Sequence, residues 1–357
     1  AQARGILPQK KADPQLLWPA GERVDLAALP PEIDPARLNR AVEEAFTEPG
    51  PETMRNTQAI VVVYRGRIVA ERYDPQFNRS TPMLGWSMSK SVTNALVGLL
   101  VKEGRLDIRQ PAPVPEWNAD DDPRSAITLD QLLRMSSGLA FEESYAPFAD
   151  ATDMLYASRS MARFAAEKPL RTAPDAEWYY SSGTANILAR IVRDTVGGTL
   201  TDFCNFARQQ LFDRIGMYSA IIEPDASGSA VGSSYMFATA RDWARFGLLV
   251  NNRGVWQGEQ ILPPDWVAYS TTPTPLAPQG KYGAQFWLNA GTPGNPADRL
   301  FPSLPADLFY LGGFNFQIVA GIPSKDLVVV RLGVTHDDSW SHEVFIRQII
   351  DAIGAST

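Results

Sequence analysis

The sequence predicts an α+β fold, in which an antiparallel sheet is flanked by helices and a helical part packs beside it. Three observations support this prediction. Strand-like runs occur near the start of the chain, they return near its end, and the residues between them carry mostly a helical period. A sheet completed by strands from both chain ends leaves the middle of the chain as an insertion, so we expect a cleft between the two parts.

The first 35 residues are rich in proline and lack a clear period, so we expect residues 1–35 to form an extended arm on the body. The segment DPARLNRAVEEAFTE predicts a helix that begins at its Asp-Pro pair. It is followed by QAIVVVYRGRIVAERY, two strand-like runs joined at Arg65-Gly66, which is typical of a hairpin. Residues 36–80 would therefore supply the first part of the sheet.

The middle of the chain, at about 81–219, is expected to form the helical part. Residues 87–103 carry a helical period that should end at Gly104. In ITLDQLLRMSSGL, Thr128 is the expected N-cap and Gly138 the expected stop of a second helix. Two further helical patterns follow in ANILARIVRDTVGG and LTDFCNFARQQLFDRIGM.

The last part of the chain, at about 220–357, returns to the sheet. FNFQIVAGIPSKDLVVVRLGV reads as two strands with a turn at PSKD, and SHEVFIRQIIDAI closes the chain as an amphipathic helix. We therefore expect residues 36–357 to fold as a single domain behind the arm.

The composition narrows the possible partners. The chain has 357 residues, 45% of them apolar, and a net charge of −7 from 33 basic and 40 acidic residues. A mildly acidic chain without a basic cluster argues against nucleic acid as the main partner. No apolar run approaches the roughly 18 residues that a membrane span requires. The oligomeric state stays open.

Cysteine and histidine are too few for a disulfide or a metal site. Cys204 is the one cysteine, and it lies in an amphipathic pattern where a small buried hydrophobe is expected. His336 and His342 are the two histidines, and no zinc-like spacing exists, so neither a metal nor another cofactor is implied. The chain begins at Ala1 rather than Met, and a periplasmic or secreted location is favoured over a cytoplasmic one.

A Ser-Met-Ser-Lys segment opens the helix predicted at 87–103. Its Ser87 and Lys90 lie three residues apart, on one helical face, and the helix dipole disfavours a charged lysine in the first turn. Serine is a weak nucleophile until a base removes its proton, and lysine becomes a base where its charged form is disfavoured. The alternative interpretation is a serine cap beside a solvated lysine.

Two other segments contain residues that suit the same chemistry. EWYYSSGTANILARIV places Tyr180 and Ser182 just before a helix, and a tyrosine beside a lysine can relay protons. YLGGFNFQIVAG has two glycines where a strand is expected to begin, so the N–H of Phe314 could donate to an oxyanion. The alternatives are aromatic packing around Tyr180 and an ordinary glycine bulge.

The order Ser-Met-Ser-Lys, Tyr-Ser-Ser, Leu-Gly-Gly resembles that of the penicillin-recognising serine hydrolases, especially the class C β-lactamase group. That group includes D-Ala-D-Ala carboxypeptidases, esterases and 6-aminohexanoate-dimer hydrolases. The segments LGWSMSKSVTNALVGLLVKEGRLDI and FATARDWARFGLLVNNRGVWQGEQILPPDWV are also similar to family segments, and the resemblance spans most of residues 55–350. It implies a β-lactamase/transpeptidase-like fold with the active site in the cleft.

The resemblance also implies roles for single residues. Ser87 would be the acylated nucleophile, Lys90 its base, and Tyr180 a partner in proton transfer. The backbone N–H groups of Ser87 and Phe314 would form the oxyanion hole, with Gly313 beside the substrate.

Four other residues are expected to contact substrate. Ser182 stands where β-lactamases usually carry an asparagine, and nylon-oligomer hydrolases also have a serine there. Leu311 stands where β-lactamases carry a lysine or histidine that helps to bind the substrate carboxylate. Tyr145, in FEESYAPFAD, is expected to cap the pocket, and His336 to line the cleft.

The expected function is that of a serine hydrolase which cleaves a carboxylic ester or amide through an acyl-enzyme on Ser87. A small ester, a 6-aminohexanoate-type amide or a peptide would be the substrate. Two alternatives stay open: a penicillin-binding receptor or cell-wall factor that acylates slowly or not at all, and a true β-lactamase or D-Ala-D-Ala carboxypeptidase.

Overall fold

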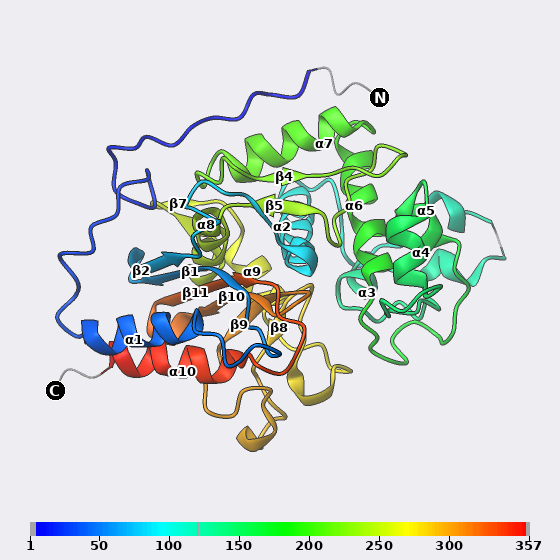
Figure 1. Ribbon diagram of the computed structural model, residues 1–357. Helices are drawn as coiled ribbons and strands as arrows, with labels where there is room; N and C mark the ends of the chain where they lie inside the picture. Colours follow the sequence, from blue (N-terminus) through cyan, green and yellow to red (C-terminus); the bar gives the residue numbers. More distant parts are fainter. Residues whose placement is uncertain (1–4, 120, 355–357) are drawn as a thin grey trace.

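The computed structural model of the protein describes residues 5–119 and 121–354 (Figure 1). A central sheet carries helices on both faces, and a group of helices from α3 to α6 lies to one side of it. The predicted α+β class, with an antiparallel sheet and a helical part beside it, is confirmed.

The central sheet has six antiparallel strands in the order β2-β1-β11-β10-β9-β8. The first long strand therefore pairs with the last one, as expected for a sheet built from both chain ends. The strands are β1 Thr57–Tyr64, β2 Arg67–Tyr73, β8 Trp287–Leu288, β9 Phe309–Gly313, β10 Gln317–Ile322 and β11 Leu327–Gly333.

Helices cover the two faces of the sheet because successive side chains of a strand point to opposite sides. In β1, Ile60 and Val62 pack against α1 and α10, while Val61 and Val63 pack in the core that contains α2 and α8. Figure 1 shows α1 and α10, from opposite ends of the chain, side by side. The four helices are α1 Pro35–Ala45, α2 Ser89–Lys102, α8 Ala240–Asn251 and α10 His342–Ile353.

Shorter elements complete the molecule. The helical part consists of α3 Leu129–Leu133, α4 Asp150–Tyr156, α5 Met161–Ala166, α6 Ser182–Val196 and α7 Leu200–Ala207, which continues as a π-helical turn at Arg208–Phe212. The remaining elements are α9 Pro264–Ser270, a small sheet of β3 Met83–Leu84, β5 Met236–Ala238 and β4 Ile221–Ile222, and the pair β6 Val255–Trp256 and β7 Glu259–Gln260. No helix among the described residues is long and apolar enough to cross a bilayer.

Three predicted boundaries need correction. The helix expected from residue 87 begins at Ser89, because Trp86–Met88 forms a 3₁₀ turn ahead of α2. The helix capped by Thr128 ends at Leu133, and Gly138 lies in a later turn where a Cβ would meet the Thr172 carbonyl oxygen at 2.3 Å. The two glycines expected to begin a strand instead end β9, because Gly313 pairs with Gln317 and residues 314–316 form the turn.

The N-terminal segment lies against α8. Trp18 is buried, and Glu22 pairs with both Arg241 and Arg245 at 2.7 and 2.8 Å. Arg245 also donates to the backbone oxygen of Gly21 at 2.6 Å. Both arginine side chains are almost fully buried, so these contacts fix the segment around residue 22 to the body.

Candidate active site

The turn that precedes α2 presents Ser87. Its first residue, Trp86, has a φ of 49°, an uncommon conformation for a bulky side chain. Gly85 precedes it, and a Cβ there would meet the ring of Trp243 at 2.3 Å, so the turn needs glycine at this position. Lys90 lies one turn further on and donates from Nζ to Ser87 Oγ at 2.9 Å. The serine and lysine that the sequence predicted as partners are therefore in contact.

Lys90 is buried, with 1% of its surface exposed. Its ammonium donates to Ser87 Oγ at 2.9 Å, to Ser182 Oγ at 3.0 Å and to the Ser233 carbonyl at 3.1 Å. Burial lowers the pKa of Lys90 to about 8, although the Glu143 carboxylate favours the charged form and opposes this shift. At pH 7 about a tenth of Lys90 is then uncharged, and a general base acts in this form.

Tyr180 lies above this lysine. Its ring stacks on Trp287 with centroids 5.2 Å apart, and Lys90 Nζ lies 4.8 Å from the centre of the tyrosine ring. Burial raises the pKa of Tyr180 well above its ordinary value, and hydrogen bonding to Ser87 offsets only part of this rise. The phenol therefore stays protonated near neutral pH, which suits a proton donor better than a base.

Glu143 extends this group of hydrogen bonds, and the sequence analysis missed it. Ser182, the first residue of α6, donates from Oγ to Glu143 Oε1 and from its backbone N–H to Oε2, both at 2.6 Å. With the contacts of Lys90, this forms a continuous chain of four side chains: Ser87, Lys90, Ser182 and Glu143. A carboxylate two residues before Tyr145 in FEESYAPFAD was the only available signal, and it carries no spacing that predicts contact with Ser182.

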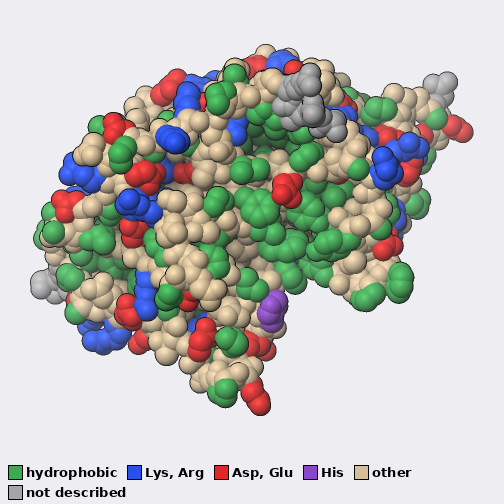
Figure 2. Space-filling model, turned by 45° about the horizontal axis from the view of Figure 1, so that its top comes forward, with side chains coloured by type: hydrophobic (Ala, Val, Ile, Leu, Met, Phe, Trp, Pro, Cys, Tyr) green, Lys and Arg blue, Asp and Glu red, His purple; other side chains and the backbone are tan. Residues whose placement is uncertain are grey.

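A cavity of about 640 Å³ opens above the serine. Figure 2 shows hydrophobic side chains gathered around a hollow on this face of the molecule. Of the predicted site residues, six line the cavity: Ser87, Tyr145, Tyr180, Gly313, Phe314 and His336. Lys90 and Ser182 are buried behind the cavity wall. Lys90 is connected to the cavity by its hydrogen bond to Ser87, and Ser182 is connected to Lys90.

Leu311 was expected to contact substrate, and this expectation is wrong. The residue is 0% exposed and packs in the core between the sheet and α2. Strand alternation turns its neighbours Tyr310 and Gly312 toward the cavity instead. Among the described residues that line this cavity, none is lysine or arginine.

The β9–β10 turn lies directly on the loop that carries the serine. A Cβ on Gly313 would meet the Gly85 carbonyl oxygen at 2.4 Å, so only glycine allows this approach. The ring of the next residue, Phe314, contacts Trp86, with centroids 5.6 Å apart. These contacts place the backbone of Phe314 close to the Ser87 turn, as an oxyanion hole shared by the two residues requires.

Tyr145 also lies close to the serine. Its ring lies 4.8 Å from that of Phe314, and 37% of the residue is exposed. Burial of its hydroxyl raises the pKa of Tyr145, while hydrogen bonding to Ser87 and Ser182 opposes the rise. The pocket-capping position predicted for Tyr145 fits this geometry.

Polar residues near the turn differ from one another in their surroundings. Gln317, the first residue of β10, donates from its side chain to the Leu84 carbonyl at 2.8 Å. His336 is exposed at the edge of the cavity. His342, which the sequence analysis left without a role, also lines it. Among the described residues, no group of three or more metal-ligating side chains is present.

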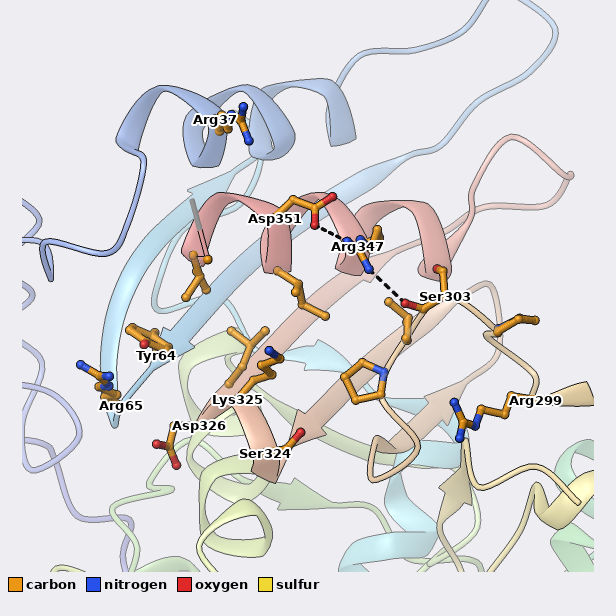
Figure 3. Close-up of a pocket in the computed structure, with 17 residues that line it drawn as sticks. Arg37, Tyr64, Arg65, Arg299, Ser303, Ser324, Lys325, Asp326, Arg347 and Asp351 are labelled. Atoms are coloured by element: carbon orange, nitrogen blue, oxygen red, sulfur yellow. Dashed lines mark hydrogen bonds and ion pairs between the residues drawn. The ribbon is translucent and has the colours of Figure 1, made fainter. Parts of the chain in front are cut away.

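A larger cavity, of about 870 Å³, shares no lining residue with the one above Ser87 (Figure 3). Its walls carry Arg299, Lys325 and Arg347, and Arg347 pairs with Asp351 on the same helix at 2.7 Å. None of the proposed catalytic side chains reaches it, so the chemistry is assigned to the cavity above Ser87.

Comparisons with known proteins agree with this geometry. The family model described as Beta-lactamase matches residues 41–345. A 6-aminohexanoate-dimer hydrolase from Paenarthrobacter ureafaciens is 26% identical in an alignment 309 residues long, which covers 80% of this chain and 74% of that protein.

Two solved structures share the fold. A presumed 6-aminohexanoate-dimer hydrolase from Bacillus anthracis is 22% identical, with a TM-score of 0.71 over 98% of this chain and 91% of the other. A penicillin-binding protein homologue from Caulobacter crescentus is 18% identical, with a TM-score of 0.66 over 90% and 97%. The chain therefore belongs to the beta-lactamase family of serine hydrolases.

Proposed function

We propose that the protein hydrolyses a small carboxylic ester or a linear amide through an acyl-enzyme on Ser87. The observation that carries this proposal is the contact between Lys90 Nζ and Ser87 Oγ, at 2.9 Å, beneath an open cavity. A buried lysine with a pKa of about 8 suits the activation of a serine.

In the first step, the substrate carbonyl binds between the N–H groups of Ser87 and Phe314. Ser87 Oγ attacks the carbonyl carbon, and neutral Lys90 takes the hydroxyl proton. As the tetrahedral intermediate collapses, the leaving amine or alcohol receives a proton. The protonated phenol of Tyr180 can donate it and be reprotonated by Lys90.

In the second step, water attacks the ester formed with Ser87. Lys90, uncharged again, accepts a proton from this water, and the same two backbone N–H groups hold the oxyanion. The carboxylic acid then leaves, and Ser87 regains its proton. The two steps together consume one water molecule and return Ser87 and Lys90 to their starting protonation states.

The charges around the cavity support substrates without a carboxylate near the reacting bond. Glu143 is a lining residue, and no lysine or arginine stands among the described ones. A substrate carboxylate would lack a charge-assisted hydrogen bond worth about 1.5–3 kcal/mol. That difference corresponds to roughly ten- to hundredfold in rate against β-lactams and D-Ala-D-Ala peptides.

Similar proteins support the same range of substrates. One relative is named as a 6-aminohexanoate-dimer hydrolase, which cleaves a linear amide by its name. A family VIII carboxylesterase has the same fold, with a TM-score of 0.66, 15% identity, and coverage of 91% of this chain and 98% of that one.

The test combines labelling with a substrate panel. A fluorophosphonate should label Ser87, and a Ser87→Ala variant should stay unlabelled. On p-nitrophenyl esters of short acids, linear anilides and nitrocefin, we expect kcat/KM for the best ester to exceed that for nitrocefin at least about tenfold.

Three results would contradict the proposal. One is an adduct mapped to Ser89, Ser136 or Ser182 instead of Ser87. Another is a kcat/KM for nitrocefin above that for every ester tested. The third is stoichiometric acylation without turnover on all substrates, which would indicate a receptor that traps its ligand.

A further inference from the structure

The cavity continues past Ser87 into an outer lobe, which we define by Phe301, Tyr310, Phe316 and His342. These residues come from the loop before β9, from β9, from the β9–β10 turn and from the first position of α10. The rings of Phe301 and Phe316 have centroids 6.3 and 5.8 Å from that of His342. The lobe is thus an aromatic extension of the catalytic cavity that the mechanism above does not use.

The hydrogen bonding of His342 fixes which of its nitrogens carries the proton. Trp340 Nε1 can only donate, and it donates to His342 Nδ1 at 2.9 Å. The ring is neutral, because burial and the nearby Arg331 lower the pKa of His342 to about 3. The proton therefore lies on Nε2, and this N–H has no hydrogen-bond partner among the residues that the structure describes.

The turn that builds the lobe is strained. Asn315 and Phe316 have φ values of 63° and 60°, which is unfavourable for a bulky aromatic residue. Arg331, 0% exposed, stabilises this turn by donating to the carbonyl of Asn315 at 3.3 Å and to that of Phe316 at 3.0 Å.

The same arginine supports the histidine. The guanidinium of Arg331 lies over the ring of Trp340 at 4.5 Å, and Trp340 orients His342 through its hydrogen bond. One buried side chain therefore holds both the aromatic wall at Phe316 and the unpaired donor at His342. Two successive residues at positive φ, both held by one buried arginine, fix the place of the Phe316 ring in the wall of the lobe.

We propose that the outer lobe is a subsite for a second amide or ester unit of the substrate. The apolar part of that unit packs against Phe301, Tyr310 and Phe316, and its carbonyl oxygen accepts a hydrogen bond from His342 Nε2–H. The substrate class is then an oligomeric linear amide or ester rather than a simple alkyl one. This inference rests on the proposed function, because the lobe continues the cavity of Ser87.

The chemistry of the lobe selects a neutral acceptor. An all-hydrocarbon chain would leave the Nε2–H unpaired, which is unfavourable for a donor removed from water. A carboxylate would lose its hydration without gaining a cation, since no lysine or arginine is among the described lining residues. A neutral carbonyl satisfies the donor and leaves its apolar flanks to the aromatic rings.

The test uses matched pairs of esters. In the first pair, two p-nitrophenyl esters have acyl chains of equal length, one all methylene and one with an internal amide. In the second pair, both compounds are phenyl acetates, and the same two chains are attached to the phenol, which is the leaving group. We expect the amide-containing member of one pair to be preferred about three- to tenfold in kcat/KM.

Three variants assign that preference to His342. His342→Leu removes the donor and should abolish the preference, whereas His342→Gln keeps a side-chain N–H and should retain it. Val344→Ala is the matched control, because Val344 lies on the exposed side of the same helix, and it should retain the preference in full. This control should also hydrolyse p-nitrophenyl acetate like the wild type, and a thermal unfolding transition close to that of the wild type shows that each His342 variant folds.

The outcomes separate this inference from the proposed function. If the wild type does not hydrolyse p-nitrophenyl acetate or any other ester, the proposed function fails. If it hydrolyses the acetate but treats both members of each pair alike, only the subsite is overturned. A preference that survives in His342→Leu overturns the subsite as well. If His342→Leu fails to fold, the preference of the wild type and its retention in His342→Gln remain the test, and a loss of the preference in His342→Gln overturns the subsite.

Discussion

The inner and outer ends of the cavity differ in how their polar groups are hydrogen-bonded. At the inner end, polar groups are joined in a chain from Ser87 through Lys90 and Ser182 to Glu143, with no gap longer than 3.0 Å. At the outer end, aromatic rings surround one N–H, on His342, that lacks a partner among the described residues. Catalysis requires polar groups that are already hydrogen-bonded in their reactive positions. Substrate selection requires a donor whose hydrogen-bond partner is supplied by the substrate.

The largest effect should come from replacing Lys90, the proposed general base in the hydrogen-bonded series at the inner end of the cavity. Lys90→Met keeps a long side chain in the buried site but removes the amine, so kcat/KM should fall about 10²- to 10⁴-fold on every ester. Lys102→Met, at the other end of α2, is the matched control and should keep full activity. Steady-state kinetics with p-nitrophenyl acetate measure both variants.

The wild-type pH profile tests the same lysine. Only uncharged Lys90 accepts a proton, so kcat/KM should rise with pH and level off above about 8, the pKa of Lys90. A profile that is flat between pH 6 and 9, or a Lys90→Met variant with more than a tenth of wild-type activity, would remove Lys90 as the base.

A smaller effect is expected at the donor. Tyr180→Phe keeps the stacking on Trp287 and loses only the hydroxyl, which stays protonated in the wild type. The loss should be about a hundredfold on anilides or alkyl esters, whose leaving groups need a proton, and less on p-nitrophenyl esters. Tyr235→Phe, whose hydroxyl donates to the Leu155 carbonyl, serves as the control. Equal losses on both classes of substrate would contradict a donor role.

The smallest effect should appear at Glu143, the last side chain of the hydrogen-bonded series that starts at Ser87. The carboxylate of Glu143 favours charged Lys90, so in Glu143→Gln the pKa of Lys90 should fall and the rising limb of the pH profile should move to lower pH by about one unit. The amide oxygen can still accept from Ser182, so the plateau should stay within about tenfold of wild type. A limb that does not move, or that moves to higher pH, would show that this carboxylate does not act on Lys90.

The sequence allowed the inner pair to be predicted, because Ser87 and Lys90 are three residues apart and a helical turn brings such residues together. The long strands were predictable for a similar reason, since β1, β2, β10 and β11 are long enough to show their period. Two-residue strands such as β8 show none. Gly138 was interpreted as a helix stop, but it serves a close approach to the Thr172 backbone, which no local pattern reveals.

The rest of the site depends on contacts between distant parts of the chain. Glu143 meets Ser182 across 39 residues, and Lys90 meets Ser182 across 92, so no local pattern identifies this group. His342 enters the cavity because α10 packs on the sheet behind β9 and β10, which is a property of the assembled fold. The alternation of side chains along a strand could have predicted that Leu311 faces away from the cavity. That prediction would have required the exact pairing of β9 with β10, which the sequence does not reveal.

The attachment of the N-terminal segment has a practical consequence for anyone who shortens or tags this chain. Glu22 bridges two buried guanidinium groups, so cutting after this residue would leave Arg241 and Arg245 with only part of their counter-charge. Breaking a buried ion pair on one side destabilises a protein by about 3–5 kcal/mol, a large share of the stability of most domains. The segment around Glu22 thus belongs to the folded unit, and a fusion partner is better attached ahead of it than in its place.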